Sequence, residues 1–145
     1  MPTPDHWLLW ALLSAVFAAL TAVLAKLGVK DVDADLAMAL RTLVVTALVV
    51  PLVWITGKWT NPLQLPARTL GYLVLSALAT GASWLCYFRA LQVGEAFRVA
   101  PVDKLSVVLV AVFAFFLLGE RPSPKDWLGI GLMVAGLLLL VIRKG

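Results

Sequence analysis

Charged residues, cysteine and histidine are all scarce in this chain. Only 14% of its 145 residues are charged, against about 25% in an average soluble domain. Hydrophobic residues make up 62% of the chain, against roughly 45–50% in such a domain. The shortage of charge excludes an ordinary soluble domain, and the abundance of apolar residues excludes a disordered chain. With a mean hydropathy of +0.98, the composition predicts an integral membrane protein.

The sequence also lacks the clusters and motifs from which enzyme sites are usually built. Histidine occurs once, as His6, and cysteine once, as Cys86 within an apolar run, so no disulfide can form within the chain. There is no Cys/His cluster, no Gly-x-Ser-x-Gly motif and no phosphate-binding loop in the sequence. We therefore expect no enzyme activity, no cofactor and no metal. The net charge of +4 does not indicate a nucleic-acid partner, because the basic residues mostly flank apolar runs.

Five apolar runs predict an all-α, polytopic membrane protein with five transmembrane helices in a single domain, residues 1–145. A helical span takes about 20 residues, and the runs lack the alternation of barrel strands. The first run is too long for a secretory signal, so it is expected to stay as a helix. Three aspartates in the first loop, Asp31, Asp33 and Asp35, offer a possible N-cap for the second helix. The helices are predicted at residues 7–28, 36–56, 69–91, 95–118 and 127–142.

Basic residues do not fix the orientation of these helices. Because five is an odd number, the two termini lie on opposite faces of the membrane. The N-terminal face carries Lys58, Arg68, Arg121 and Lys125, and the opposite face carries Lys26, Lys30, Arg89, Arg98, Arg143 and Lys144. Four against six is a weak bias. Two alternatives stay open: a C-terminus inside, or insertion both ways followed by head-to-tail pairing.

Tryptophan is distributed unevenly between the two faces. An interfacial aromatic belt is predicted at the N-terminal face, where the amphipathic indole ring suits the boundary between lipid and water. Its members are Trp7, Trp10, Trp54, Trp59 and Trp127.

Three charged residues, Arg41, Asp103 and Lys104, are predicted to lie within the membrane. A charge inside a span costs about 2.5–3.5 kcal/mol on insertion scales and usually marks a pathway or a pairing. At 1.5 Å per residue, Arg41 lies roughly 8 Å from the opposite face, and Asp103 and Lys104 roughly 12–14 Å from it. Neighbours on a regular helix point in different directions, so Asp103 is free to pair with Arg41. A structural ion pair, with Lys104 snorkelling to the surface, and a charged vestibule are both open alternatives.

Pro101 lies shortly before the Asp103–Lys104 pair of residues. A proline inside a span frees a backbone carbonyl, and a broken helix is tolerated where it lines a cavity. The simpler interpretation is a kink that shapes helix packing.

Hydroxyl side chains form a stripe on the predicted third helix. Ser76, Thr80, Ser83 and Tyr87 are spaced by four, three and four residues, which places them on one face. Trp84 flanks this stripe, and Ser14 and Thr21 form a thinner one on the first helix. Hydrogen bonding between helices explains either stripe. Two stripes beside a charge cluster favour a lined cavity.

The last predicted helix is rich in small residues, which permit close helix approach by a neighbour in the chain or by a second protomer. These residues are Gly129, Gly131, Ala135 and Gly136.

Several stretches, taken in order, resemble the EamA-type repeat of the drug/metabolite transporter superfamily. They are Ala96-Phe-Arg-Val-Ala-Pro-Val-Asp-Lys-Leu-Ser106, Phe115-Phe-Leu-Leu-Gly-Glu-Arg-Pro-Ser123, and Trp127-Leu-Gly-Ile-Gly-Leu-Met-Val-Ala-Gly136. The ending Tyr87-Phe-Arg-Ala-Leu-Gln-Val-Gly94 of the third helix agrees with this, as does Lys26-Leu-Gly28 followed by Arg41. The resemblance covers nearly the whole chain.

Most EamA-type proteins carry two such repeats, inverted relative to each other, whereas this chain is similar to the half-size bacterial and archaeal members. The resemblance therefore implies a dual-topology, antiparallel homodimer of ten helices with alternating access. It implies a secondary transporter or facilitator of an amino-acid-like or other small solute across a prokaryotic inner membrane. The first helix lacks the acidic residue of the four-helix small multidrug members, which argues against their proton-coupled export of cations. The alternative is a non-transporting membrane subunit or half of a lipid-carrier flippase.

The substrate path is expected to run along the first four helices, with zwitterionic or anionic solutes favoured by Arg41 and Lys104 beside one carboxylate. The residues predicted to line it are Ser14, Thr21, Arg41, Ser76, Thr80, Ser83, Trp84, Tyr87, Asp103 and Lys104.

Overall fold

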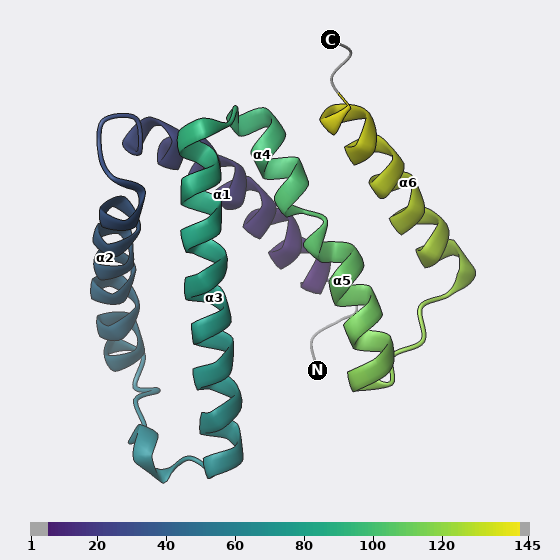
Figure 1. Cartoon of the computed structure of the whole chain (residues 1–145). Coiled ribbons are helices and arrows are strands. Elements are labelled where there is room, and N and C mark those ends of the chain that lie inside the picture. Colours follow the sequence, from purple (N-terminus) through teal and green to yellow (C-terminus); the bar gives the residue numbers. More distant parts are fainter. Residues whose placement is uncertain (1–5, 143–145) are drawn as a thin grey trace. The chain divides into compact units, whose positions relative to one another are not determined.

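A computed structural model describes residues 6–142 of the chain, which fall into two compact units. The first unit ends at Val93 and the second begins at Gly94. The described residues form helices and connections without a strand, and five helical segments are long and apolar enough to cross a membrane. Figure 1 shows them in chain order. The predicted all-α, five-helix membrane protein is therefore confirmed.

The first unit contains α1 (His6–Gly28), α2 (Ala34–Ile55), the 3₁₀ turn η1 (Pro62–Gln64) and α3 (Ala67–Val93). Each helix boundary lies within two residues of its prediction. Of the three aspartates that could cap α2, Asp33 is the N-cap, because its carboxylate accepts hydrogen bonds from the backbone N–H groups of Asp35 (2.9 Å) and Leu36 (3.3 Å).

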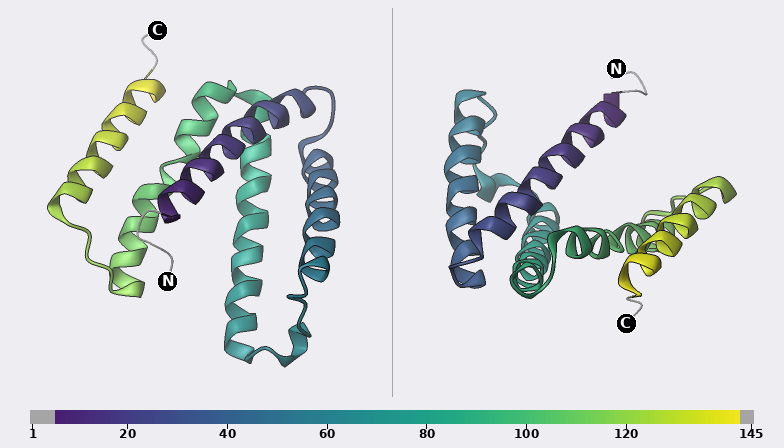
Figure 2. Two further views of the ribbon diagram at one scale, coloured as in Figure 1. Left: turned by 180° about the vertical axis from the view of Figure 1, so that it is seen from behind. Right: turned by 90° about the horizontal axis from the view of Figure 1, so that it is seen from above.

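In this unit α2 and α3 lie side by side and antiparallel, and α1 also contacts α3 (Figures 1 and 2). Its buried residues come from the end of α1, the first loop, the start of α2 and the last turns of α3. They are Ala22, Val29, Ala34, Phe88 and Leu91. The packed core therefore lies at the end of the unit where α1 joins α2, which is called here the loop end.

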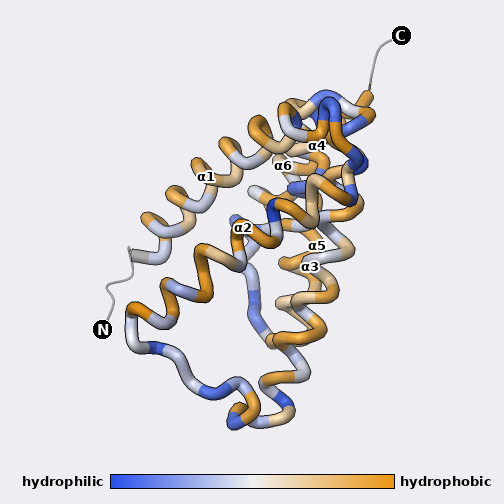
Figure 3. Tube along the Cα trace, turned by 90° about the vertical axis from the view of Figure 1, so that its left-hand side faces the viewer, coloured by the Kyte–Doolittle hydropathy of each residue, from blue (hydrophilic) through white to orange (hydrophobic). Residues whose placement is uncertain are grey.

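Away from the loop end, large apolar side chains are exposed. Trp7 is 68% exposed and Leu43 67%. Figure 3 shows hydrophobic residues along α1 and α3, whereas the connection that follows α2 is mostly hydrophilic. This pattern suits helices whose outer surfaces are solvated by lipid tails.

The second unit contains α4 (Ala96–Asp103), α5 (Ser106–Phe113), the π-helical segment η2 (Ala114–Leu118) and α6 (Pro124–Val141). The span predicted over residues 95–118 is found as the apolar segment Ala96–Leu118, but its α-helix is interrupted after Asp103. Pro101 has no N–H to donate and its ring crowds the preceding turn. The chain tightens there, with Lys104 N–H donating to the Pro101 carbonyl (2.9 Å) and Leu105 N–H to the Val102 carbonyl (3.0 Å). Pro101 thus lies just before a short interruption of the α-helix within one spanning segment, at which the backbone stays right-handed.

Helix α6 begins three residues before its predicted start at residue 127. Ser123 is its N-cap, and it forms a capping box with Asp126 in which Ser123 N–H donates to Asp126 Oδ2 (2.7 Å) and Asp126 N–H to Ser123 Oγ (3.3 Å). Before it, Gly119 ends η2 in a left-handed conformation (φ 68°) that favours glycine.

The small residues of α6 are exposed in the second unit. A methyl group added at Gly129, Gly131 or Gly136 would meet no described atom within 4 Å beyond its chain neighbours and the adjacent backbone of α6, and Ala135 is also exposed. The role of these residues in packing against a second protomer stays a prediction. Arg143 and Lys144, which entered the charge count, and the side chain of His6 lie outside what the structure describes.

Candidate substrate path

The helices of the first unit form a cleft of about 420 Å³, called here the α1–α3 cleft. Its walls are mainly apolar, with Leu24 and Val29 on the α1 side and Leu40 on α2. Of the described residues that line it, only Thr21 and Arg41 have polar side chains. Hollows of this volume are typical of small-molecule sites. Two residues predicted for the path, Thr21 and Arg41, are thus brought to one cleft.

Arg41 borders this cleft and rests against two aromatic rings of α3. Its guanidinium carbon lies 4.7 Å from the Trp84 ring centroid and 5.5 Å from that of Phe88. Trp84 and Phe88 are four residues apart, so both project from the same face of α3. Within the described part of the first unit, no acidic side chain forms an ion pair with Arg41.

The aromatic contacts only partly offset the cost of this charge. A cation–π contact contributes about 0.5–2 kcal/mol, whereas a charge in a span costs about 2.5–3.5 kcal/mol on insertion scales. Aromatic rings also offer no oxygen acceptor to the five N–H donors of a guanidinium. Arg41 is therefore only partly satisfied by the first unit itself.

A second hollow of about 410 Å³, the α2–α3 groove, lies between α2 and α3. Ser76, Thr80 and Trp84 line it from α3, and Thr42 from α2. The Thr80 hydroxyl donates to the Ser76 carbonyl (2.9 Å) and the Thr42 hydroxyl to the Met38 carbonyl (2.8 Å). These two hydroxyls therefore donate their hydrogen bonds within their own helices, and their oxygen lone pairs remain as acceptors for the groove.

Trp84 connects the two hollows, since it lines the α2–α3 groove while its ring contacts Arg41, which lines the α1–α3 cleft. The Arg41–Trp84 contact thus joins a residue that lines one hollow to a residue that lines the other. Both residues were predicted for the path, although their contact was not.

The other predicted residues of the first unit line neither hollow. Ser14 and Ser83 are exposed on α1 and α3. Tyr87 is half-buried, with its ring edge-on to Phe88 at a centroid distance of 6.5 Å. The predicted hydroxyl stripe therefore divides after Thr80, and only its first half reaches a hollow.

Asp103 and Lys104 lie at the break between α4 and α5 in the second unit. The expectation that their side chains diverge is wrong, because Lys104 Nζ lies 3.5 Å from Asp103 Oδ2. That expectation assumed a regular helix, whereas α4 ends at Asp103. The pairing of Asp103 with Arg41 and the place of both residues on the path stay predictions.

Apart from Trp84, the apolar residues that line the hollows were not predicted for the path, among them Phe88, and neither was the polar residue Thr42. Phe88 follows Trp84 by four residues, so the spacing places a second ring on the same face of α3. Thr42 follows Arg41 directly and is one of two threonines in α2, so nothing in the sequence distinguished it.

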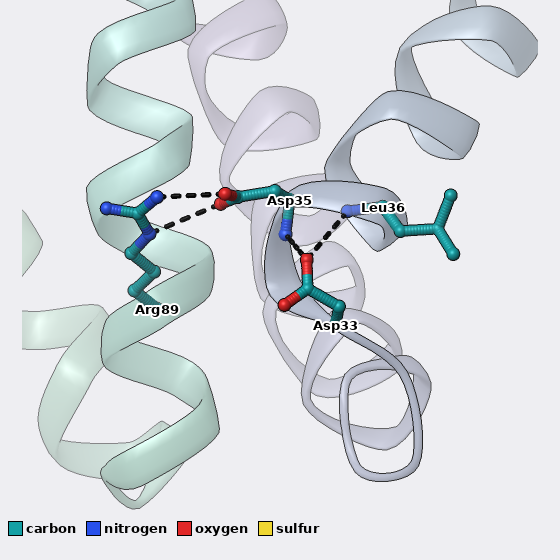
Figure 4. Close-up of polar contacts among 4 residues, drawn as sticks. All are labelled: Asp33, Asp35, Leu36 and Arg89. Atoms are coloured by element: carbon teal, nitrogen blue, oxygen red, sulfur yellow. Dashed lines mark hydrogen bonds and ion pairs between the residues drawn. The ribbon is translucent and has the colours of Figure 1, made fainter.

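The sequence interpretation also missed a polar cluster at the loop end, made of Lys26, Asp35, Arg89 and Gln92. Arg89 Nη2 donates to Asp35 Oδ2 (2.8 Å) and Nε to Oδ1 (3.2 Å), a two-point pair that joins α3 to α2 (Figure 4). Gln92 Nε2 donates to the Val32 carbonyl (2.9 Å), and Lys26 Nζ to the Leu91 carbonyl. In the sequence, Arg89 was counted only among the basic residues that bear on membrane orientation. In the structure it also joins two helices.

Known proteins resemble this chain, one of them over almost its whole length. The chain is 53% identical over 138 residues to an "uncharacterized transporter in cobO 3′ region" of Sinorhizobium sp., which covers 95% of this chain and 98% of that protein. It is 36% identical over 75 residues to a probable 4-amino-4-deoxy-L-arabinose-phosphoundecaprenol flippase subunit ArnE of Pectobacterium atrosepticum, covering 50% of this chain and 64% of that one. It is also 30% identical over 95 residues to the uncharacterized transporter YwfM of Bacillus subtilis, covering 64% of this chain and 31% of YwfM.

No solved structure matches the chain. The family model described as "EamA-like transporter family" matches residues 5–142, which confirms the resemblance found in the sequence. The family and the names of these relatives point to transport rather than to enzyme chemistry. The chain is therefore a multi-pass membrane protein that belongs to the EamA-like transporter family.

Proposed function

We propose that this protein is a secondary transporter or facilitator of a small solute, working as an antiparallel homodimer across a bacterial inner membrane. The observation that carries the proposal is Arg41, a partly satisfied charge that borders an open cleft between spanning helices. Charged residues inside spans commonly mark substrate pathways. A relative of nearly the same length that is named a transporter supports the same function.

The antiparallel homodimer is favoured by the size of the chain and by its charges. Transporters built from inverted repeats place their substrate sites where the two repeats meet. A chain with five spans supplies one repeat, so a second copy inserted the other way would supply its inverted partner. The nearly balanced basic residues, four against six, allow insertion in both directions. Alternating access would then follow from movement of one protomer against the other.

Flux by the purified protein in liposomes tests the transport proposal. The panel contains amino acids, organic anions and organic cations, with and without a pH gradient. We expect saturable flux of at least one solute, lost on Arg41→Ala or Asp103→Asn. Absence of flux from a folded dimer would overturn the proposal.

Cysteine labelling tests the dual topology separately. In a Cys86→Ser background, single cysteines at Pro2 and at Gly145 are expected to react with an impermeant reagent from both sides of the membrane. Labelling of each site from one side only would exclude antiparallel insertion while leaving transport itself possible.

A second candidate is a non-transporting subunit or half of a lipid-carrier flippase. The match to the probable flippase subunit ArnE over half of the chain favours it. Co-purification with a distinct membrane protein, together with a folded homodimer that moves no solute, would support this candidate over the first.

A further inference from the structure

The walls of the α1–α3 cleft have the chemistry of a site for an anion with an apolar body. Leu24, Val29, Leu40 and Phe88 supply apolar surface, and Arg41 supplies a charge. Among residues 6–142, no aspartate or glutamate lines the cleft. An ammonium group placed there would have no carboxylate partner, so the cleft suits a plain anion better than a zwitterion.

A comparison with Arg89 shows what Arg41 lacks. The Arg89 guanidinium donates two hydrogen bonds to the two oxygens of one carboxylate, at 3.2 and 2.8 Å. This fork is the arrangement that a guanidinium adopts with carboxylate or phosphate oxygens. Arg41 has two aromatic rings at cation–π distance and no acidic partner within the described residues of its unit.

The two rings also determine which hydrogen-bond acceptors the Arg41 guanidinium can reach. Trp84 and Phe88 hold the guanidinium beside the cleft while leaving it without an oxygen acceptor from an acidic side chain of this unit. A planar carboxylate or a phosphate monoester in the cleft would supply the missing oxygens as charge-assisted hydrogen-bond acceptors. The rest of the ligand would cover Leu24, Leu40 and Phe88 and gain from their burial.

We propose that the α1–α3 cleft is an anion subsite, in which Arg41 binds the single carboxylate or phosphate group of a ligand whose apolar body fills the remainder. This inference rests on the proposed transport function and narrows its substrate class to anions without an ammonium group. A water-soluble organic anion and the headgroup of an anionic lipid share this chemistry.

The test is binding of radiolabelled phenylacetate to the full chain in phosphatidylcholine nanodiscs, measured by equilibrium dialysis. Three probes of similar shape are compared with it: neutral phenylacetamide, cationic phenethylamine and zwitterionic phenylalanine. We expect saturable phenylacetate binding that is about tenfold or more tighter than binding of each of the others, because only phenylacetate satisfies Arg41 without introducing an unpaired ammonium.

Arg68→Gln is the matched control for Arg41→Gln. Arg68 also contacts an aromatic ring, that of Tyr72 at 5.8 Å, but it lines neither hollow. Arg41→Gln should weaken phenylacetate binding about tenfold or more, whereas Arg68→Gln should change it by less than about twofold. Arg41→Lys keeps the charge but loses the fork, so an intermediate affinity is expected. Gel filtration and circular dichroism of each variant establish that it is folded.

Native mass spectrometry with added phosphatidylglycerol separates the two sources of the anion. Lipid retained by the wild type and lost from Arg41→Gln identifies a lipid headgroup as an occupant. Arg41-dependent binding of phenylacetate without such lipid retention identifies a free solute, and both outcomes support the subsite.

The proposal is overturned if phenylacetate binds no tighter than phenylacetamide, or if folded Arg41→Gln binds phenylacetate as the wild type does. Failure of the subsite is distinguishable from failure of the proposed function. Wild-type flux of any solute without Arg41-dependent anion binding would remove the subsite alone, and Arg41-dependent binding without flux would remove transport alone.

Discussion

Two arginines in the first unit have opposite surroundings. Arg89, at the loop end, shares a two-point ion pair with Asp35. Arg41, farther along α2, contacts aromatic rings and borders a cleft. The same side chain thus joins two helices at one place and is left partly unsatisfied at another. The difference indicates which charge serves the fold and which is available to a ligand.

The surroundings of each arginine support this distinction. The loop end combines the Asp35–Arg89 pair with two side-chain hydrogen bonds to backbone carbonyls and with the buried residues Val29 and Leu91. The α1–α3 cleft instead leaves space of about 420 Å³ beside Arg41. Substitutions at the loop end should therefore affect stability, and those at the cleft should affect ligand handling.

The largest expected effect is the loss of flux in Arg41→Gln, by about tenfold or more, because the transported anion loses its charged hydrogen bonds. The melting temperature should stay unchanged or rise, since the substitution removes a charge from a span without leaving an acidic partner of the first unit unpaired. Flux into liposomes and thermal unfolding in detergent measure the two quantities. If Arg41→Gln shows wild-type flux, Arg41 does not serve the ligand, and the proposed difference in role between Arg41 and Arg89 is wrong.

The reverse result is expected for Arg89→Gln. This substitution leaves Asp35 without its partner and should lower the melting temperature by about one to three degrees, because both side chains are more than half exposed, while flux per folded protein is retained. The double variant Asp35→Arg/Arg89→Asp should recover part of the loss, because it restores the pair in the opposite sense. A loss of flux at an unchanged melting temperature would instead place Arg89 on the path.

Much of the fold follows from the sequence because spans are long apolar runs and their ends carry polar caps. The aspartates of the first loop predict a cap for α2, but only the structure shows that Asp33 is the one that forms it. The capping box of Ser123 and Asp126 was not predicted, and α6 accordingly begins earlier than predicted. Pro101 was noticed, but a proline alone does not determine whether a helix kinks or breaks, and here α4 ends at Asp103.

The surroundings of the hollows were harder to predict, because they depend on how each helix is rotated about its axis. Arg41 is conspicuous as a charge in an apolar run. Phe88, in contrast, resembles any apolar helix residue until α3 is seen to turn it toward Arg41. Asp35 and Arg89 lie 54 residues apart in the chain, so their pairing requires knowing that α2 and α3 are neighbours. Spacing shows which residues share a face of one helix, but not toward which neighbouring helix that face is turned.

A smaller effect is expected from removing one ring beneath Arg41. Trp84→Ala should weaken phenylacetate binding roughly fivefold, because a cation–π contact contributes about 1 kcal/mol and its loss lets the guanidinium leave the cleft wall. Trp84→Phe keeps an aromatic face and should retain most of the affinity. Equilibrium dialysis of both variants gives the comparison. Equal losses in the two would mean that Trp84 acts through its size or its indole N–H and not through the face of its ring.

The smallest expected difference separates two threonines, one in each hollow. Thr21 lines the α1–α3 cleft with Arg41, whereas Thr80 lines the α2–α3 groove and donates its proton to the Ser76 carbonyl. Valine matches threonine in shape, so each Thr→Val change removes only a hydroxyl. Thr21→Val should weaken phenylacetate binding by about threefold, since a neutral hydrogen bond contributes roughly 0.5–1.5 kcal/mol. Thr80→Val should leave binding unchanged, because its proton is already bonded within α3. The opposite ranking would move the anion from the α1–α3 cleft to the α2–α3 groove and would make Trp84, which borders that groove, the wall that the ligand contacts.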